Sequence, residues 1–116
     1  MNDTSNDLAR TRNTNLLTEH FAALQRVWTH ANGNHGKCRV TSSLLLCLYN
    51  GTRFPVDMTN LRTLDADLFN DCLLVLQLDY RTYSEPHDLL GVRGDRFEAI
   101  AKNWRFVDHQ FGKREL

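Results

Sequence analysis

The stretch DADLFNDCLLVLQLDYR, residues 65–81, decides the fold. Its apolar side chains cover a wide arc of a helix, namely Leu68, Phe69, Cys72, Leu73, Val75 and Leu76. Asp65 is a suitable N-cap, and Arg81 at the other end complements the helix dipole. Because so wide an apolar arc must be covered by neighbouring elements, the stretch predicts a helix at the centre of the domain.

The preceding residues 48–65, LYNGTRFPVDMTNLRTLD, contain the residue types of a folded connection between two helices. Gly51 can end the first helix, and Pro55 favours an extended conformation at the residue before it. Asp57 or Thr59 can start a short turn ahead of the central helix. We therefore predict a connector whose apolar side chains are drawn onto the core.

Residues 44–49, just upstream of the connector, are apolar almost all round. This is consistent with a short buried helix that starts at Thr41 or Ser42. A buried strand is the alternative, because periodicity does not distinguish the two in so short a run.

The longest helical pattern is NTNLLTEHFAALQRVWTHANG, residues 13–33. One helix face is apolar, comprising Leu17, Phe21, Leu24, Trp28 and Ala31. The pattern predicts a helix that starts at Thr14 or Asn15 and ends at a left-handed Asn32-Gly33.

Two shorter helices are predicted near the C-terminus. SEPHDLLG, residues 84–91, has Ser84 as a cap and Gly91 as a stop, and Asp95 can cap a last helix. The fold class expected is all-α, a compact bundle of about five helices with short connections. Residues 14–111 would form a single helical domain, between a flexible N-terminal tail, 1–13, and a C-terminal tail, 112–116.

The overall composition is that of an ordinary globular protein. The 116 residues are 41% hydrophobic, and 14 Lys and Arg balance 14 Asp and Glu, so no overall field attracts nucleic acid or an anionic membrane. No apolar run approaches the roughly 20 residues that span a bilayer, and the polar first residues do not resemble a secretory signal. We expect a cytoplasmic protein without a membrane segment, in which the 3 cysteines are free thiols.

Five short motifs in residues 44–87 carry a family resemblance. They are Tyr49-Asn50-Gly51, Phe54-Pro55-Val56-Asp57, Leu61-Arg62-Thr63-Leu64-Asp65, Asp79-Tyr80-Arg81 and Glu85-Pro86-His87. With them, the segment resembles a family of short uncharacterised bacterial proteins carried on integrative and conjugative elements and in accessory gene clusters. The resemblance implies a domain of unknown function and a mobile-element setting, but no activity.

The strongest polar cluster in the sequence is formed by Asp79, Arg81, Glu85 and His87. These four side chains would meet if the central helix turns back into the next one. They are candidates for acid–base catalysis or for half of a metal site. The preferred interpretation is structural, with Arg81 paired to Asp79 or Glu85, so no residue is assigned as catalytic.

A second group, His30, His35 and Cys38, has metal-ligand residue types in a loop rich in Gly and Asn. A structural zinc site needs a fourth ligand and usually contains tighter pairs such as Cys-x-x-Cys. A solvated loop is therefore the default interpretation, and no cofactor is expected.

Binding residues are expected where side chains face outward. In and beside the connector these are Tyr49, Arg53 and Arg62, and Phe106 is out of phase with the apolar face of the last helix. The leading hypothesis is a small non-enzymatic accessory protein, regulatory or anti-defence, that binds another protein or itself.

Two alternative functions remain open. Nucleic acid could bind to a basic face formed by the first and last helices, with Arg10, Arg12, Arg26, Arg96, Lys102 and Arg105. A metal-dependent or acid–base enzyme would use Glu85 and His87.

Overall fold

The computed structural model describes the backbone of residues 3–111 and 114–115 and the side chains of residues 17–110. The elements in chain order are α1 (Asp3–Ala31), α2 (Gly36–Tyr49), the 3-10 helix η1 (Met58–Thr63), α3 (Ala66–Thr82), α4 (Pro86–Leu90), α5 (Gly94–Asn103), β1 (Val107–Asp108), the 3-10 helix η2 (His109–Phe111) and β2 (Arg114–Glu115). β1 and β2 form a small antiparallel pair in which Val107 lies opposite Glu115. The predicted all-α fold of about five helices is confirmed.

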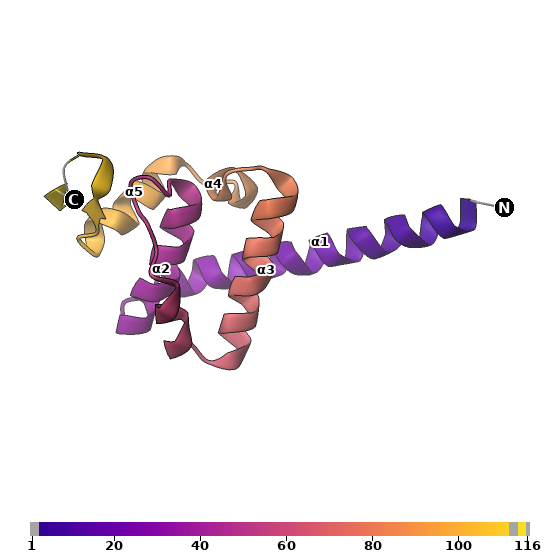
Figure 1. Ribbon diagram of the computed structural model, residues 1–116, viewed down its shortest axis with the longest axis horizontal. Coiled ribbons are helices and arrows are strands. Elements are labelled where there is room, and N and C mark those ends of the chain that lie inside the picture. The colour runs from indigo at the N-terminus through magenta and orange to yellow at the C-terminus, as the bar shows by residue number, and fades with distance from the viewer. Residues whose placement is uncertain (1–2, 112–113, 116) are drawn as a thin grey trace.

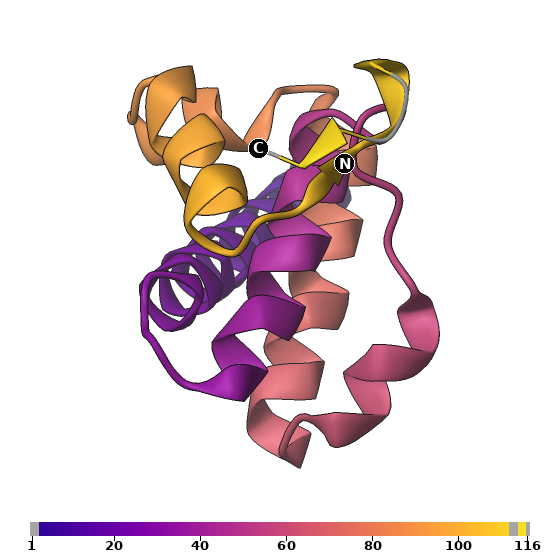
Figure 2. The ribbon, with the colours of Figure 1, turned by 90° about the vertical axis from the view of Figure 1, so that its left-hand side faces the viewer.

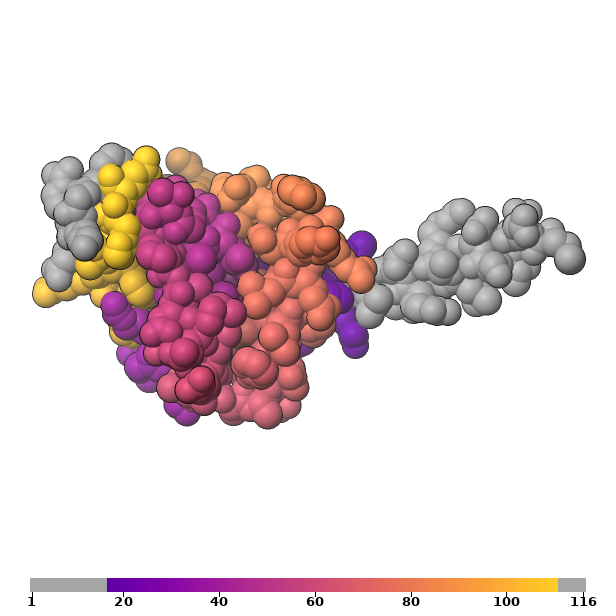
Figure 3. Space-filling model, viewed as in Figure 1, coloured from indigo at the N-terminus to yellow at the C-terminus, as the bar shows by residue number. Residues whose placement is uncertain are grey.

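Helices α2 and α3 lie side by side across α1 and run in the same direction (Figure 1). Figure 2, turned by 90°, shows how residues 50–65 return along the outside of these two helices, so that α3 starts at the end where α2 began. Helices α4 and α5 then cover the end at which α2 and α3 finish. Figure 3 shows α2, the connector and α3 as one continuous face, with residues 106–110 at its edge.

The core lies where α1, α2, α3 and α5 meet, and Phe97 is its largest fully buried side chain. The Phe97 ring stacks on Trp28 with centroids 4.9 Å apart and on Tyr49 with centroids 5.1 Å apart. These contacts join α5 to both α1 and α2. Burial of a side chain of this size contributes about 1.5–3 kcal/mol to stability.

The connector packs as predicted from its apolar residues. Phe54, Leu61 and Leu64 are buried. Asp57 starts η1 by accepting a hydrogen bond from the Thr59 N–H, and Asp65 starts α3 by accepting one from the Leu68 N–H at 2.9 Å. The residues 48–65 are therefore a structured return segment between α2 and α3.

Two helix starts differ from the prediction. Helix α1 begins at Asp3 instead of Thr14 or Asn15, because residues 3–13 contain no Gly or Pro to interrupt it. Helix α2 begins at Gly36, and residues 44–49 are helical, so the alternative of a strand is wrong. The hydroxyls of Thr41 and Ser42 donate to the carbonyls of Cys38 and Ala31 within the structure instead of capping a helix.

The predicted helix ends are only partly correct. Gly91 ends α4 in the left-handed conformation, with a φ of 70°. Gly33 has no positive φ, so the expected left-handed stop at Asn32-Gly33 is wrong. The N-caps of α4 and α5 are Glu85 and Arg93, not Ser84 and Asp95. No helix in the part of the chain that the structure describes has both the length and the hydropathy for crossing a membrane.

Candidate functional site

A half-buried network around Arg53 is the most extensive polar arrangement of the described side chains. Arg53 lies in the connector four residues after the end of α2, and its Nε donates to Asp108 Oδ2 at 2.8 Å. Its Nη1 and Nη2 donate to Glu98 Oε2 and Oε1 at 2.8 and 2.9 Å, and the Tyr49 hydroxyl donates to the same Glu98 Oε2 at 2.5 Å. The network thereby ties the end of α2 to α5 and to β1.

The electrostatics of this network favour one fixed state of charge. Burial and the hydrogen bond to Glu98 raise the pKa of Tyr49 to about 12. The hydrogen bonds from Arg53 lower the pKa of Glu98, and the same contact raises the pKa of Arg53. Around neutral pH Tyr49 is therefore a neutral phenol, Arg53 a guanidinium and Glu98 a carboxylate, which suits a structural clamp.

The expectation that Tyr49 and Arg53 face outward is wrong. Only 15% of the Arg53 side chain is exposed, and Tyr49 is stacked against Phe97. Their partners Glu98 and Asp108 lie far away in the sequence, so the pattern around Arg53 did not predict this burial. Arg62 is exposed, as expected.

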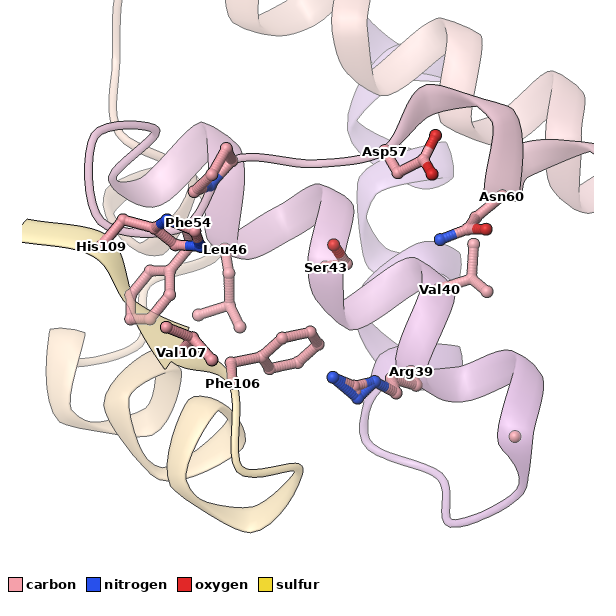
Figure 4. A pocket seen from close by; sticks show the side chains of 12 residues that line it. Arg39, Val40, Ser43, Leu46, Phe54, Asp57, Asn60, Phe106, Val107 and His109 are labelled. Carbon is pink, nitrogen blue, oxygen red and sulfur yellow. The ribbon is translucent and has the colours of Figure 1, made fainter. Parts of the chain in front are cut away.

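Phe106 lies half-buried in the wall of a hollow and is not freely exposed (Figure 4). The Arg39 guanidinium carbon is 4.3 Å from the centroid of its ring. The hollow has a volume of about 400 Å³ and is also bordered by Asp57 and Asn60 from the other side. Its floor is apolar, with Leu46 among the side chains that form it.

The structure does not bring Asp79, Arg81, Glu85 and His87 into one cluster. Asp79 and Glu85 border a hollow of about 350 Å³ that is formed by the end of α3, the segment between α3 and α4, and Leu48 of α2. Arg81 is exposed and, among the described residues, makes no ion pair with either acid, so the expected pairing is wrong. Tyr83 is the reason, because its left-handed conformation ends α3 and redirects the chain before α4.

His87 points away from that hollow and into the aromatic core. Its ring lies 5.3 Å from Tyr49 and 6.1 Å from Phe97, measured between centroids. Its Nδ1 is buried and has no hydrogen-bond partner among the described residues, while Nε2 is 3.6 Å from Asp88. Because Glu85 and His87 share no site, the geometry does not favour acid–base catalysis by this pair.

Two tyrosines missed by the sequence interpretation flank the Asp79–Glu85 hollow. Tyr80 and Tyr83 are 80% and 95% exposed, which is unusual for side chains with so much apolar surface. Tyr80 lies on the same face of α3 as Leu73, which is at the exposed edge of the apolar arc of this helix. Its seven-residue spacing from Leu73 was the available signal.

The structure does bring His30, His35 and Cys38 together at the turn between α1 and α2. One potential ligand atom from each residue lies within 4.8 Å of the others. His30 Nδ1 is 2.8 Å from the Thr41 hydroxyl, and burial together with the nearby His35 lowers the pKa of His30. The spacing in the sequence therefore corresponds to a real cluster.

The basic residues of the first and last helices whose side chains the structure describes have different surroundings. Arg26 donates to Asp71 on α3 with distances of 2.8 and 2.9 Å, which neutralises it. Arg96 and Lys102 border a hollow of about 520 Å³ beside the end of α1, and Arg105 is exposed. Arg10 and Arg12 lie outside the residues whose side chains the structure describes.

The structure is an all-α domain in which the Arg53 network forms a polar clamp between α2, α5 and β1. The exposed Tyr80 and Tyr83 form an aromatic surface at the corner between α3 and α4. The family model described as "Family of unknown function (DUF7673)" matches residues 21–105, and the chain belongs to this family. The match runs from α1 to just beyond α5 and includes the α3–α4 corner, the His30 cluster and, of the Arg53 network, Tyr49, Arg53 and Glu98 but not Asp108. Neither a curated protein nor a solved structure matches the chain.

Proposed function

We propose that the protein is a small non-enzymatic binding protein whose partner docks at the α3–α4 corner, defined by Asp79, Tyr80, Tyr83, Ser84 and Glu85. The observation that carries this proposal is the exposure of Tyr80 and Tyr83, at 80% and 95%, beside a hollow. Exposed tyrosines are enriched at protein contact surfaces because they offer a large rigid ring and a polar hydroxyl.

The chemistry of the corner favours a basic side chain of the partner. Asp79 and Glu85 contribute carboxylates, and among the described residues neither has a cationic partner. Burial raises the pKa of Asp79, and a bound cation would offset that desolvation. Two aromatic rings beside two acids suit an arginine or lysine, which can interact with both kinds of group.

The proposed setting is the cytoplasm of a bacterium, where the protein would serve a mobile genetic element in a regulatory or anti-defence role. The resemblance of residues 44–87 to proteins carried on such elements supports this setting. The partner is a second protein, or a second copy of the same chain.

The test combines size-exclusion chromatography with light scattering and affinity capture from a bacterial lysate. A Tyr80→Ser/Tyr83→Ser variant and a Glu85→Gln variant should lose the self-association or the captured partner. Met58→Ser is the matched control, because Met58 is 50% exposed and lies on η1, outside the corner. A monomer that retains no partner, or a partner that the tyrosine variant retains equally well, would overturn the proposal.

Nucleic-acid binding remains the second candidate, and the hollow bordered by Arg96 and Lys102 is the feature that favours it. The Arg96 guanidinium carbon lies 5.5 Å from the centroid of the Trp28 ring, so one of the two cations lies beside an aromatic ring. This candidate predicts binding to single-stranded or duplex DNA that weakens steeply with salt. Failure to bind either DNA at low salt, or binding unchanged in Lys102→Ala, would reject it.

A further inference from the structure

The turn between α1 and α2 places two imidazoles and a thiol around one point. His30 is in the last turn of α1, His35 is the N-cap residue of α2, and Cys38 is in the first turn of α2. We propose that these three residues bind a divalent ion of the zinc type. This proposal is independent of partner binding at the α3–α4 corner.

The distances are close to those of a bound ion. The potential ligand atoms of the three residues lie within 4.8 Å of one another. In a tetrahedral zinc site, with bonds of about 2.0 Å to nitrogen and about 2.3 Å to sulfur, neighbouring ligand atoms are about 3.5 Å apart. Closure around an ion therefore needs movements of about 1 Å. His35 can supply them, because it is exposed and its side chain makes no capping hydrogen bond.

The other two ligands are already held in place by their surroundings. The Thr41 hydroxyl lies 2.8 Å from His30 Nδ1 and 3.1 Å from the Cys38 carbonyl, to which it donates. A second hydrogen-bonding group on the imidazole is the usual way in which proteins orient a metal-binding histidine. An ion bound to Nε2 of His30 would keep the contact with Thr41.

Gly33 allows the turn to pass close to the thiol. A Cβ added at this position would lie only 2.6 Å from Cys38 Sγ and 3.2 Å from the His30 carbonyl oxygen. The close approach of the chain to the sulfur explains the glycine, since the backbone there has no positive φ. It also keeps the Sγ atom of Cys38 within reach of both imidazoles.

The type of ion follows from the ligands. Nitrogen and sulfur donors select zinc and related transition metals, whereas magnesium and calcium prefer oxygen. On binding, Cys38 releases its thiol proton to solvent and ligates as a thiolate, a negative charge that suits the N-terminal end of α2. Three protein ligands leave the fourth tetrahedral position to water.

Titration with Co²⁺ is the direct test, because a cysteine thiolate bound to cobalt gives a charge-transfer absorption band in the near ultraviolet. We expect this band in the full chain, at a single ion per chain, and its loss when Zn²⁺ is added. His35→Ala should weaken Co²⁺ binding by at least tenfold, and Cys38→Ser should abolish the band. Thr41→Val, which removes a supporting contact, should weaken binding by about ten- to a hundredfold.

The controls are a cysteine and a histidine outside the cluster. Cys47→Ser and the exposed His109→Ala should bind Co²⁺ as the unaltered chain does. Cys38 is buried, so its replacement can also disturb folding, whereas His35 is exposed and its replacement isolates the loss of a ligand. A missing thiolate band in the unaltered chain, or equal Co²⁺ affinity in His35→Ala, would overturn the proposal.

Discussion

Arg53 binds Glu98 through both terminal nitrogens of its guanidinium, at 2.8 and 2.9 Å, although the two residues are 45 positions apart in the sequence. The third donor, Nε, reaches Asp108. A planar guanidinium that meets two carboxylates in this way fixes both direction and distance. One side chain thereby determines how the connector, α5 and β1 fit together.

Removing this guanidinium should destabilise the domain. Arg53→Ala removes the ion pair with Asp108, which is 1% exposed, and both hydrogen bonds to Glu98, and should lower the free energy of unfolding by about 3 kcal/mol. Urea unfolding followed by circular dichroism measures the change. Arg62→Ala is the control, because Arg62 is exposed and the expected effect is within about 0.5 kcal/mol. Equal losses in the two variants would contradict the role given to Arg53.

The phenol of Tyr49 should make stability fall at high pH. Its pKa is raised in the folded protein from 10.0 to about 12, so folding favours the neutral phenol. This contribution is fully present below pH 10 and is lost as the pH rises towards 12. Urea unfolding measured across this range should show the decrease. Tyr49→Phe cannot ionise, and its stability should therefore fall less over the same range.

The carboxylate of Glu98 should make the stability of the domain fall at low pH. Its pKa is lowered from 4.5 in the folded protein, chiefly by hydrogen bonds from Arg53. The stabilisation is therefore present above pH 4.5 and disappears as the pH falls through the lowered pKa. Glu98→Gln should flatten the acid-side decrease in unfolding free energy, and Glu85→Gln, outside the clamp, should leave it unchanged.

Phe97 should be the most sensitive position of the aromatic core. It is 0% exposed and stacks on both Trp28 and Tyr49, so Phe97→Ala leaves a cavity among three helices. We expect a loss of about 3–5 kcal/mol. Thermal unfolding followed by tryptophan fluorescence reports both the stability and the changed surroundings of Trp28. Phe97→Leu, which keeps more of the volume, should cost less.

Two glycines of the α1–α2 turn provide a matched comparison. Gly33→Ala would place a methyl group 2.6 Å from Cys38 Sγ, and we expect a loss of about 1–3 kcal/mol. Gly36→Ala meets nothing within 4 Å and lies at the start of α2, where alanine favours the helix by up to about 1 kcal/mol. Chemical unfolding of both variants should therefore show changes of opposite sign.

The parts of the fold that depend on local spacing were predictable. The apolar arc of residues 65–81 predicted α3, and Asp65 caps it because capping depends only on residues a few positions away. His30, His35 and Cys38 also lie close together in the sequence, at the connection between α1 and α2. Short-range geometry was sufficient to predict α3 and its cap, whereas for His30, His35 and Cys38 a solvated loop had been the default interpretation.

Features that depend on distant partners were not predictable from one sequence. Arg53 was expected at the surface because nothing near it indicated Glu98 or Asp108. The expected cluster of Asp79, Arg81, Glu85 and His87 does not form, because of the backbone conformation between α3 and α4. Tyr83 adopts a left-handed conformation that its residue type does not favour, and this turns His87 towards Phe97.

Because α2 and α3 run parallel, their helix dipoles add, so the domain has a dipole although its net charge is zero. The C-terminal ends of both helices, at Tyr49 and Thr82, lie beside α4, and each carries a partial negative charge from its unpaired carbonyls. Asp79 and Glu85 stand at this same end. A neutral chain can in this way present a negative pole to an approaching cation, with the positive N-terminal ends of α2 and α3 at the opposite pole.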